Sequence, residues 1–214
     1  MIPPRDLDQW LFTSIQGSAR EENLLSLVAD FSLWVPPPIV RLVGGAVYPK
    51  TRRVREGEKR NTLLPDGTRL WQNQAARHAF WTALEEPTDF DMPHNVRKAW
   101  VCHIYGDQDS ARNPEHYTHL ANLVALPGAL QSLSDSESVR AILKRRSYDA
   151  YGYTGPLGTI PPVPEAYPSR WPGLNEAYPL EAAQRVAQVL IDLRLRFPTF
   201  HEPSRKAPPQ EMAE

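Results

Sequence analysis

Side chains that could activate water and hold a divalent cation are concentrated between residues 99 and 135. An apolar stretch ends in Cys102 and His103, and a second apolar stretch begins directly after Asn122. The polar loop between them contains four potential metal ligands: Asp107, Asp109, His116 and His119. Phosphodiester hydrolysis needs a base that takes a proton from water and a cation that stabilises charge on the phosphate. The segment contains residue types suited to both tasks.

In this order the segment resembles the ββα-metal, or HNH, nuclease superfamily, in which two strands and a helix build the active site. The resemblance implies that His103, at the end of the first strand, is the general base. It implies that Asn122, at the start of the second strand, braces the connection between the strands. Gln131 stands nine residues after Asn122 and Asp135 four residues further on, at the positions of the family's helix-borne metal ligands. Residues at i and i+4 share a helix face, so both side chains could approach one ion.

The expected cofactor is one divalent metal ion. Gln131 replaces the family's usual histidine, and a neutral amide oxygen suits a hard ion such as Mg²⁺, with Mn²⁺ or Zn²⁺ as alternatives. His116 and His119 are substitute ligands in the loop. Cys102 occupies a position where the family often has Asp, Glu or His, and it fits a small buried apolar residue better than a ligand. The incomplete ligand set leaves a second interpretation open, in which the fold is kept but catalysis is lost, and the protein is a nucleic-acid-binding or protein-interaction module.

The net charge of −1 argues against a protein that coats nucleic acid through bulk charge. Two local basic clusters are nevertheless present, one in residues 50–60 and one directly after residue 139. We interpret them as phosphate contacts whose principal residues are Lys50, Arg52, Arg53, Arg55, Lys144, Arg145 and Arg146. The family resemblance favours DNA as the partner, although nothing in these residues separates DNA from RNA. A homodimer that reads two half-sites is left open.

The length of 214 residues suits one domain. A single cysteine excludes an internal disulfide and an all-cysteine zinc site. No stretch approaches 18 uninterrupted apolar residues, which excludes a transmembrane helix. The first residues contain no long apolar segment of the kind found in secretory signals, so a cytoplasmic protein without a membrane partner is expected.

The periodicity of apolar residues predicts an α+β fold, mainly helical, in which one integrated domain over residues 1–197 surrounds a ββα element at about 97–135. Helical spacing is found in four regions: 6–34 (two helices broken near Gly17), 73–84, 136–151 and 180–196. The proline triplet at 36–38 is expected to stop the second helix, and residues 39–47 are expected to form a strand. The basic residues 50–60 and the proline-rich residues 152–179 predict irregular structure, residues 87–95 a linker, and residues 198–214 a disordered tail.

Overall fold

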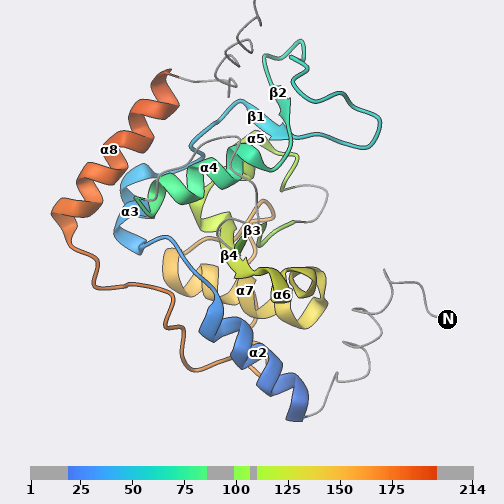
Figure 1. The fold of residues 1–214 in the computed structure, drawn as a ribbon, viewed down its shortest axis with the longest axis vertical. Helices are drawn as coiled ribbons and strands as arrows, with labels where there is room; N and C mark the ends of the chain where they lie inside the picture. The colour runs from blue at the N-terminus through green and yellow to red at the C-terminus, as the bar shows by residue number, and fades with distance from the viewer. Residues whose placement is uncertain (1–18, 86–98, 107–109, 197–214) are drawn as a thin grey trace, which may run out of the picture.

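The computed structural model describes residues 19–85, 99–106 and 110–196, and within them the fold is α+β (Figure 1). Several predictions lie outside these residues: the helix before residue 19, the linker at 87–95, the tail at 198–214, and the loop residues Asp107 and Asp109. Among the described helices, none is long and apolar enough to cross a membrane.

The centre of the molecule is a two-stranded antiparallel hairpin. Strand β3 (Ala99–His103) pairs with β4 (Leu123–Pro127), and the register places His103 opposite Leu123. Two short helical segments, α5 (Pro114–Tyr117) and η2 (Leu120–Asn122), lie in the connection between the strands. The chain leaves β4 into α6 (Gly128–Gln131) and η3 (Ser132–Asp135).

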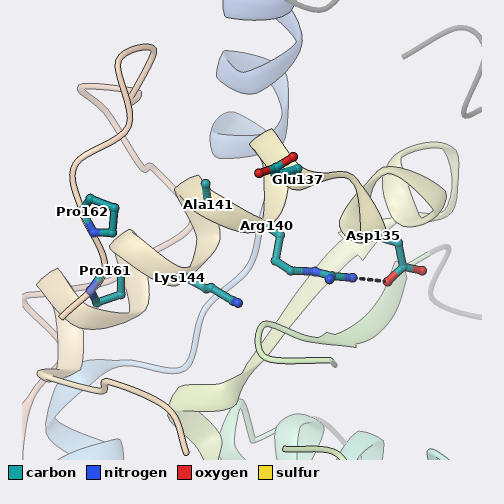
Figure 2. A pocket seen from close by; sticks show the side chains of 7 residues that line it. All are labelled: Asp135, Glu137, Arg140, Ala141, Lys144, Pro161 and Pro162. Carbon is teal, nitrogen blue, oxygen red and sulfur yellow. Dashed lines mark hydrogen bonds and ion pairs between the residues drawn. The ribbon is translucent and has the colours of Figure 1, made fainter. Parts of the chain in front are cut away.

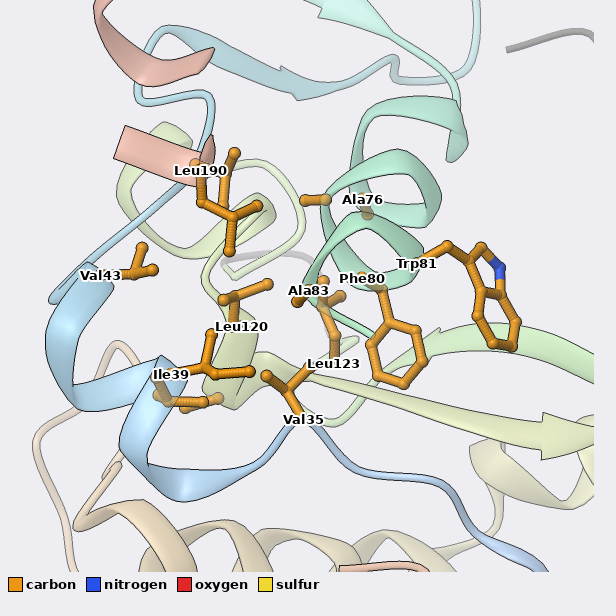
Figure 3. Packing of buried hydrophobic residues seen from close by; sticks show 14 of the residues in the cluster. Val35, Ile39, Val43, Ala76, Phe80, Trp81, Ala83, Leu120, Leu123 and Leu190 are labelled. Atoms are coloured by element: carbon orange, nitrogen blue, oxygen red, sulfur yellow. The ribbon is translucent and has the colours of Figure 1, made fainter. Parts of the chain in front are cut away.

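The hairpin separates two hydrophobic clusters because side chains alternate between the faces of a strand. Val101 and Leu123 belong to the cluster on one face, which also contains side chains of α3 (Pro37–Val43), α4 (Gln74–Ala83) and α8 (Leu180–Arg196) (Figure 3). Cys102 and Val124 belong to the cluster on the other face, with side chains of α2 (Ala19–Phe31) and α7 (Glu137–Tyr151). Cys102 and His103 therefore point to opposite sides of the hairpin.

The helices predicted at 73–84, 136–151 and 180–196 are confirmed as α4, α7 and α8. The buried residues of α8 are Ala183, Val186, Ala187 and Leu190, at the helical spacing expected for residues 180–196. Leu195, in the last turn, is 73 % exposed.

The prediction of a strand at 39–47 is wrong, because residues 37–43 form helix α3. Helix α2 already ends at Phe31, so the prolines begin α3 rather than end α2. Proline suits the first turn of a helix, where its fixed φ is helical and its missing N–H is not needed. Gly44 has φ 57° and donates its N–H to the Val40 carbonyl, so glycine ends the helix in the left-handed conformation that other residues adopt at a cost.

The basic segment at 50–60 was predicted to be an irregular loop, and this is wrong at its start. Strand β1 (Thr51–Arg53) pairs in parallel with β2 (Arg69–Trp71). The pairing depends on a strand 16 or more residues away, which local periodicity does not reveal. The strand holds Arg53 in a fixed place, and its backbone N–H donates to the Ala111 carbonyl at 3.0 Å.

Residues 152–179 contain no helix or strand, as predicted, and are fixed to the helices by side-chain contacts. Trp171 packs edge-on against Trp34, with ring centroids 5.7 Å apart. Gly173 accepts a hydrogen bond from the backbone N–H of Trp34, and Arg146 forms an ion pair with Glu176 at 2.8 Å. The segment thereby links the residues that follow α2 to helix α7.

Candidate functional site

His103 lies at the end of β3 with a half-buried side chain and a defined orientation. Its Nε2 lies 2.9 Å from the backbone carbonyl oxygen of Tyr117, and its ring stacks on the Tyr117 ring with centroids 5.3 Å apart. A carbonyl oxygen can only accept, so Nε2 carries the hydrogen. In the neutral imidazole, Nδ1 is then the nitrogen with the free lone pair, and it can take a proton from water.

The surroundings of His103 keep its imidazole neutral. The pKa of His103 is lowered to about 4, chiefly by burial; the hydrogen bond to the Tyr117 carbonyl acts in the opposite direction, and the positive charge of Arg53 adds a smaller lowering. The proton-accepting form is therefore the stable one at neutral pH. A base with a pKa this low is populated in full but is weaker than one with a pKa near 7.

Asn122 is completely buried and ties together three parts of the connection between the strands. Its Oδ1 accepts a hydrogen bond from the Tyr105 backbone N–H at 2.9 Å. Its Nδ2 donates to the His116 carbonyl at 3.0 Å and to the Ser110 hydroxyl at 3.1 Å. The amide thus uses both its acceptor and its donors to fix the loop that carries Tyr117, on which His103 rests.

A cavity of about 440 Å³ lies next to the partners of His103, and its lining includes Arg53, Arg55, Gln72, Asn73 and Gln74. Gln72 accepts a hydrogen bond through its carbonyl from the Tyr117 hydroxyl. Asn73 donates through Nδ2 to the carbonyl of Val101, two residues before His103 on the same strand. Residues that line this cavity therefore bond to Tyr117 and Val101, and Tyr117 in turn bonds to His103.

Two buried polar atoms at this cavity have no partner among the described residues, namely Asn73 Oδ1 and Gln74 Oε1. Buried oxygens of this kind are normally hydrogen-bonded, so these two are unusual in the described part of the chain. Neither residue was selected from the sequence, where both lie at the start of the helix predicted over residues 73–84. Asn73 precedes α4, but its side chain makes no capping hydrogen bond.

The predicted metal ligands Gln131 and Asp135 do not form a metal site with the other described residues. The Asp135 side chain is 81 % exposed and forms an ion pair with Arg140 at 3.0 Å. Cys102 lies on their side of the hairpin, but burial raises the pKa of its thiol to about 11, and its sulfur donates to the Trp100 carbonyl. Among the described residues, no group of three or more His, Cys, Asp or Glu side chains is placed to hold a metal ion.

Asp135 lines a different cavity, of about 460 Å³, together with Arg140 and Lys144 (Figure 2). The figure shows Arg140 reaching to the Asp135 carboxylate, and Lys144 extending from the same side of α7. Arg140 pairs with Oδ1 of Asp135, and among the described residues no other acidic or histidine side chain except Glu137 lines this cavity. These residues do not fit the metal site implied by the family resemblance.

His116 and His119 do not line the cavity that contains Asp135. They line a third cavity with Tyr153 and Arg194 at one end of α8. His116 Nδ1 lies 2.6 Å from the Tyr153 hydroxyl, and the His119 ring stacks on the Tyr153 ring with centroids 4.6 Å apart. The structure brings these two histidines together, but not with Gln131 and Asp135.

The predicted phosphate-contacting residues fall into two groups that differ in their contacts. In the β1 region Lys50, Arg53 and Arg55 are exposed, whereas Arg52 forms two hydrogen bonds with the Glu58 carboxylate. Arg53 and Arg55 line the cavity that also contains Gln72 and Asn73, and exposed cations of this kind suit a phosphate chain.

The α7 group is engaged by the protein itself. Lys144 lies over the Tyr105 ring at 4.9 Å, Arg145 pairs with Asp149 at 2.8 Å, and Arg146 pairs with Glu176 at 2.8 Å. Arg145 also donates to the carbonyl of Pro161 in the proline-rich segment. The contacts of Arg145 with Pro161 and of Arg146 with Glu176 attach residues 152–179 to α7.

Comparison of the chain with models of known protein families, with curated proteins and with solved structures found no significant match. The candidate site therefore has to be interpreted from its own geometry.

Proposed function

We propose that this protein is an HNH-type endonuclease, with the β3–β4 hairpin and the following α6 as its ββα element and DNA as its substrate. The observation that carries the proposal is the orientation of His103. Its Nε2 is committed to the Tyr117 carbonyl, its Nδ1 is left to accept a proton, and the imidazole is neutral at physiological pH.

The proposed reaction is hydrolysis of a phosphodiester bond. His103 takes a proton from water through Nδ1, the water oxygen attacks phosphorus, and one ester oxygen leaves. Arg53 and Arg55, which line the adjacent cavity, contact the phosphate oxygens. Arg53 already influences the pKa of His103, so its charge is close enough to stabilise negative charge that develops next to the base.

Asn122 supports this arrangement without touching substrate. Its three hydrogen bonds hold the loop that carries the Tyr117 carbonyl. Members of the resembled family use a divalent cation, but the described residues do not assemble its ligands. The protein's own groups therefore supply the base (His103), the phosphate contacts (Arg53 and Arg55) and the positioning of the base (Asn122).

A second candidate function is a nucleic-acid-binding module without catalysis. It is favoured by the ion pair of Asp135 with Arg140 and by the buried Cys102 thiol, because both remove ligands from the family's metal position. The exposed cations near β1 serve binding equally well in this case.

Plasmid nicking separates the two functions. The full chain is incubated with supercoiled DNA in the presence of Mg²⁺, Mn²⁺, Zn²⁺ or EDTA, and binding to a short duplex is measured in parallel. His103→Ala should abolish nicking and leave binding intact. The matched control is His78→Gln, since His78 is also buried with a pKa lowered to about 4 but lies on α4 against Tyr48.

Nicking by the His103→Ala variant at the wild-type rate would exclude His103 as the base. Duplex binding without nicking under every metal condition would instead support the binding module. An EDTA-resistant activity that depends on His103 would show that the reaction does not need a dissociable metal ion.

A further inference from the structure

The cavity that contains His116 and His119 has its own chemistry, separate from that of His103. It measures about 350 Å³ and lies between residues 45–49, the α5 region, Tyr153 and α8. Its polar lining comes from Glu115, His116, His119, Tyr153 and Arg194. Its lining residues do not overlap with those of the cavity beside His103.

His119 presents an N–H donor in this cavity. Its Nδ1 accepts a hydrogen bond from the Ala121 backbone N–H at 3.2 Å, so Nδ1 has no hydrogen of its own. The neutral ring must then carry its hydrogen on Nε2. Burial lowers the pKa of His119 to about 4, with smaller contributions from His116 and Arg194, so this neutral form is the stable one at pH 7.

His116 is hydrogen-bonded to Tyr153 across a 2.6 Å contact between its Nδ1 and the phenol oxygen. Burial raises the pKa of the Tyr153 hydroxyl above its usual range, so this phenol keeps its proton and has a hydrogen to donate. When the phenol is the donor, the ring hydrogen of neutral His116 lies on Nε2. Two imidazoles therefore contact Tyr153, and His119 offers its Nε2–H.

Arg194 adds a cation with an unused donor. Its Nη2 donates to the carbonyl of Val43 at 2.9 Å, which anchors the guanidinium at the end of α3. Its Nε is buried and has no partner among the described residues. Gly45 lies beside it, where a Cβ would stand 3.7 Å from Arg194 Nη2. The guanidinium is charged and lines the cavity, so a ligand with anionic oxygens is the one that its charge favours there.

We propose that this cavity is a binding site for a phosphate group, in which Arg194, His119 and His116 donate to the phosphate oxygens. Among the described residues these histidines do not assemble with a third His, Cys, Asp or Glu ligand into a metal site. Glu115 also lines the cavity, but it is an exposed residue and lies at the solvent-facing edge of the site. Arginine is well suited to phosphate because its N–H groups match the spacing of the oxygens.

The phosphate could belong to a nucleic acid or to a small phosphorylated molecule, and the chemistry of the cavity is the same for both. The proposal does not rest on the nuclease function, because none of its residues contacts His103 or lines the neighbouring cavity. A variant that lacks the His103 imidazole should bind phosphate as the wild type does.

Histidine side-chain NMR tests the site in the full-length protein. Titration with inorganic phosphate, at an ionic strength held constant with sodium chloride, should shift the ring ¹⁵N signals of His116 and His119 to a plateau. Bound phosphate should also raise the pKa of His119, because an anion favours the imidazolium. The ring signals of His78 serve as an internal reference and should not move.

Arg194→Gln should weaken phosphate binding by roughly tenfold to a hundredfold, as expected for the loss of charged hydrogen bonds. Arg196→Gln is the matched control, since Arg196 is an exposed residue in the last turn of the same helix. A single-stranded oligonucleotide that displaces phosphate would identify the nucleic-acid backbone as the source, and phosphate binding without displacement would identify a small phosphorylated molecule.

Two results would overturn the proposal. One is the absence of any saturable shift of His116 and His119 in the wild-type protein, a result that does not depend on a variant that folds. The other is an unchanged affinity for phosphate in a folded Arg194→Gln variant. Neither result would bear on plasmid nicking by His103.

Discussion

His103 and Tyr117 are joined twice: the imidazole ring stacks on the phenol ring at an interplanar angle of 13°, and its Nε2 donates to the carbonyl of the same residue. One residue of α5 therefore fixes both the plane of the His103 ring and the tautomer. Tyr117 is itself fixed, because it is fully buried and its hydroxyl donates to the Gln72 carbonyl. The only ring nitrogen left for proton transfer is Nδ1.

The first prediction concerns the pH dependence of nicking. In the proposed reaction His103 accepts a proton only when neutral, and its pKa is lowered to about 4. The rate should therefore be independent of His103 protonation at neutral pH and should fall as the pH drops through about 4. The measurement is the initial nicking rate against pH, with duplex binding recorded at each pH. A midpoint near the usual histidine value of about 6.5 would show that the pKa of His103 during the reaction is not set by its burial in the protein without substrate.

The second prediction concerns Asn122. Asn122→Ala leaves the Tyr105 N–H and the His116 carbonyl without their buried partner. The variant should lose about 3 kcal/mol of unfolding free energy, in the range for a broken buried hydrogen-bond network. Urea unfolding measures the loss.

Asn113→Ala is the control for Asn122→Ala. Asn113 caps α5 through one hydrogen bond to the Glu115 N–H, and its removal should cost only about 1 kcal/mol. Equal losses in the two variants would contradict a bracing role for Asn122.

His103 and Asn122 could be selected from the sequence because strand ends and the order of residue types are local features. The partners of each could not be selected. The loop between the strands positions the Tyr117 carbonyl, the Ser110 hydroxyl and the His116 carbonyl. A hydrogen bond to a backbone group requires no particular residue type, so the sequence does not reveal it. The same holds for the His116 and Tyr153 contact, which spans 37 residues.

The fold was predictable where one apolar face repeats over several turns, as in α8. Helix α3 was misassigned because its seven residues are apolar almost throughout, so that strand and helix periodicities look alike. The proline at its start and Gly44 at its end are the local signals that distinguish the two. The surroundings of the predicted metal ligands were not predictable for another reason: an acidic residue near a helix says nothing of Arg140, which pairs with Asp135 from the following helix α7.

The third prediction separates the two basic clusters. The double variant Arg53→Gln/Arg55→Gln should weaken duplex binding and reduce its salt dependence by about two ion equivalents, since both side chains are exposed. Fluorescence anisotropy at several salt concentrations measures this slope. Thermal stability should change little.

The matched double variant is Arg145→Gln/Arg146→Gln. Its residues pair with Asp149 and Glu176, so the salt slope of binding should stay the same and the melting temperature should fall. A reversed pattern, with binding lost here and retained in the β1 variant, would move the nucleic-acid interface to α7.

The fourth prediction concerns stability at acid pH. Burial lowers the pKa of His78, His103 and His119 to about 4, whereas the unfolded chain protonates histidine near 6.5. The unfolded state therefore binds more protons between these values, and stability is full above about 6.5 and is lost as the pH falls towards 4. At a pH of about 5, each histidine lowers the free energy of unfolding by at most about 2 kcal/mol relative to its value above a pH of about 6.5.

Urea unfolding at neutral and acid pH tests this linkage. His78→Gln, which removes the titrating group next to Tyr48, should reduce the loss of stability between the two conditions. A pH dependence identical to that of the wild type would mean that His78 is protonated in the folded state or takes no part in the linkage.

The fifth prediction concerns the attachment of the proline-rich segment at Gly173. A Cβ built on this residue would stand 1.8 Å from the Ser32 carbonyl oxygen, and that oxygen belongs to backbone that cannot move aside as a flexible side chain can. Gly173→Ala must therefore displace the segment and break the hydrogen bond from the Trp34 N–H to the Gly173 carbonyl. We expect a loss of about 3 kcal/mol or more in the free energy of unfolding, together with a change in the fluorescence of the packed Trp34 and Trp171 pair.

Gly158→Ala is the control, because Gly158 has φ +67° but open space around its Cβ position, so backbone strain alone should cost about 1 kcal/mol. If Gly173→Ala cost no more than Gly158→Ala, the segment would not be packed against the residues after α2, and the contacts of Arg145 and Arg146 would be left as its principal attachment.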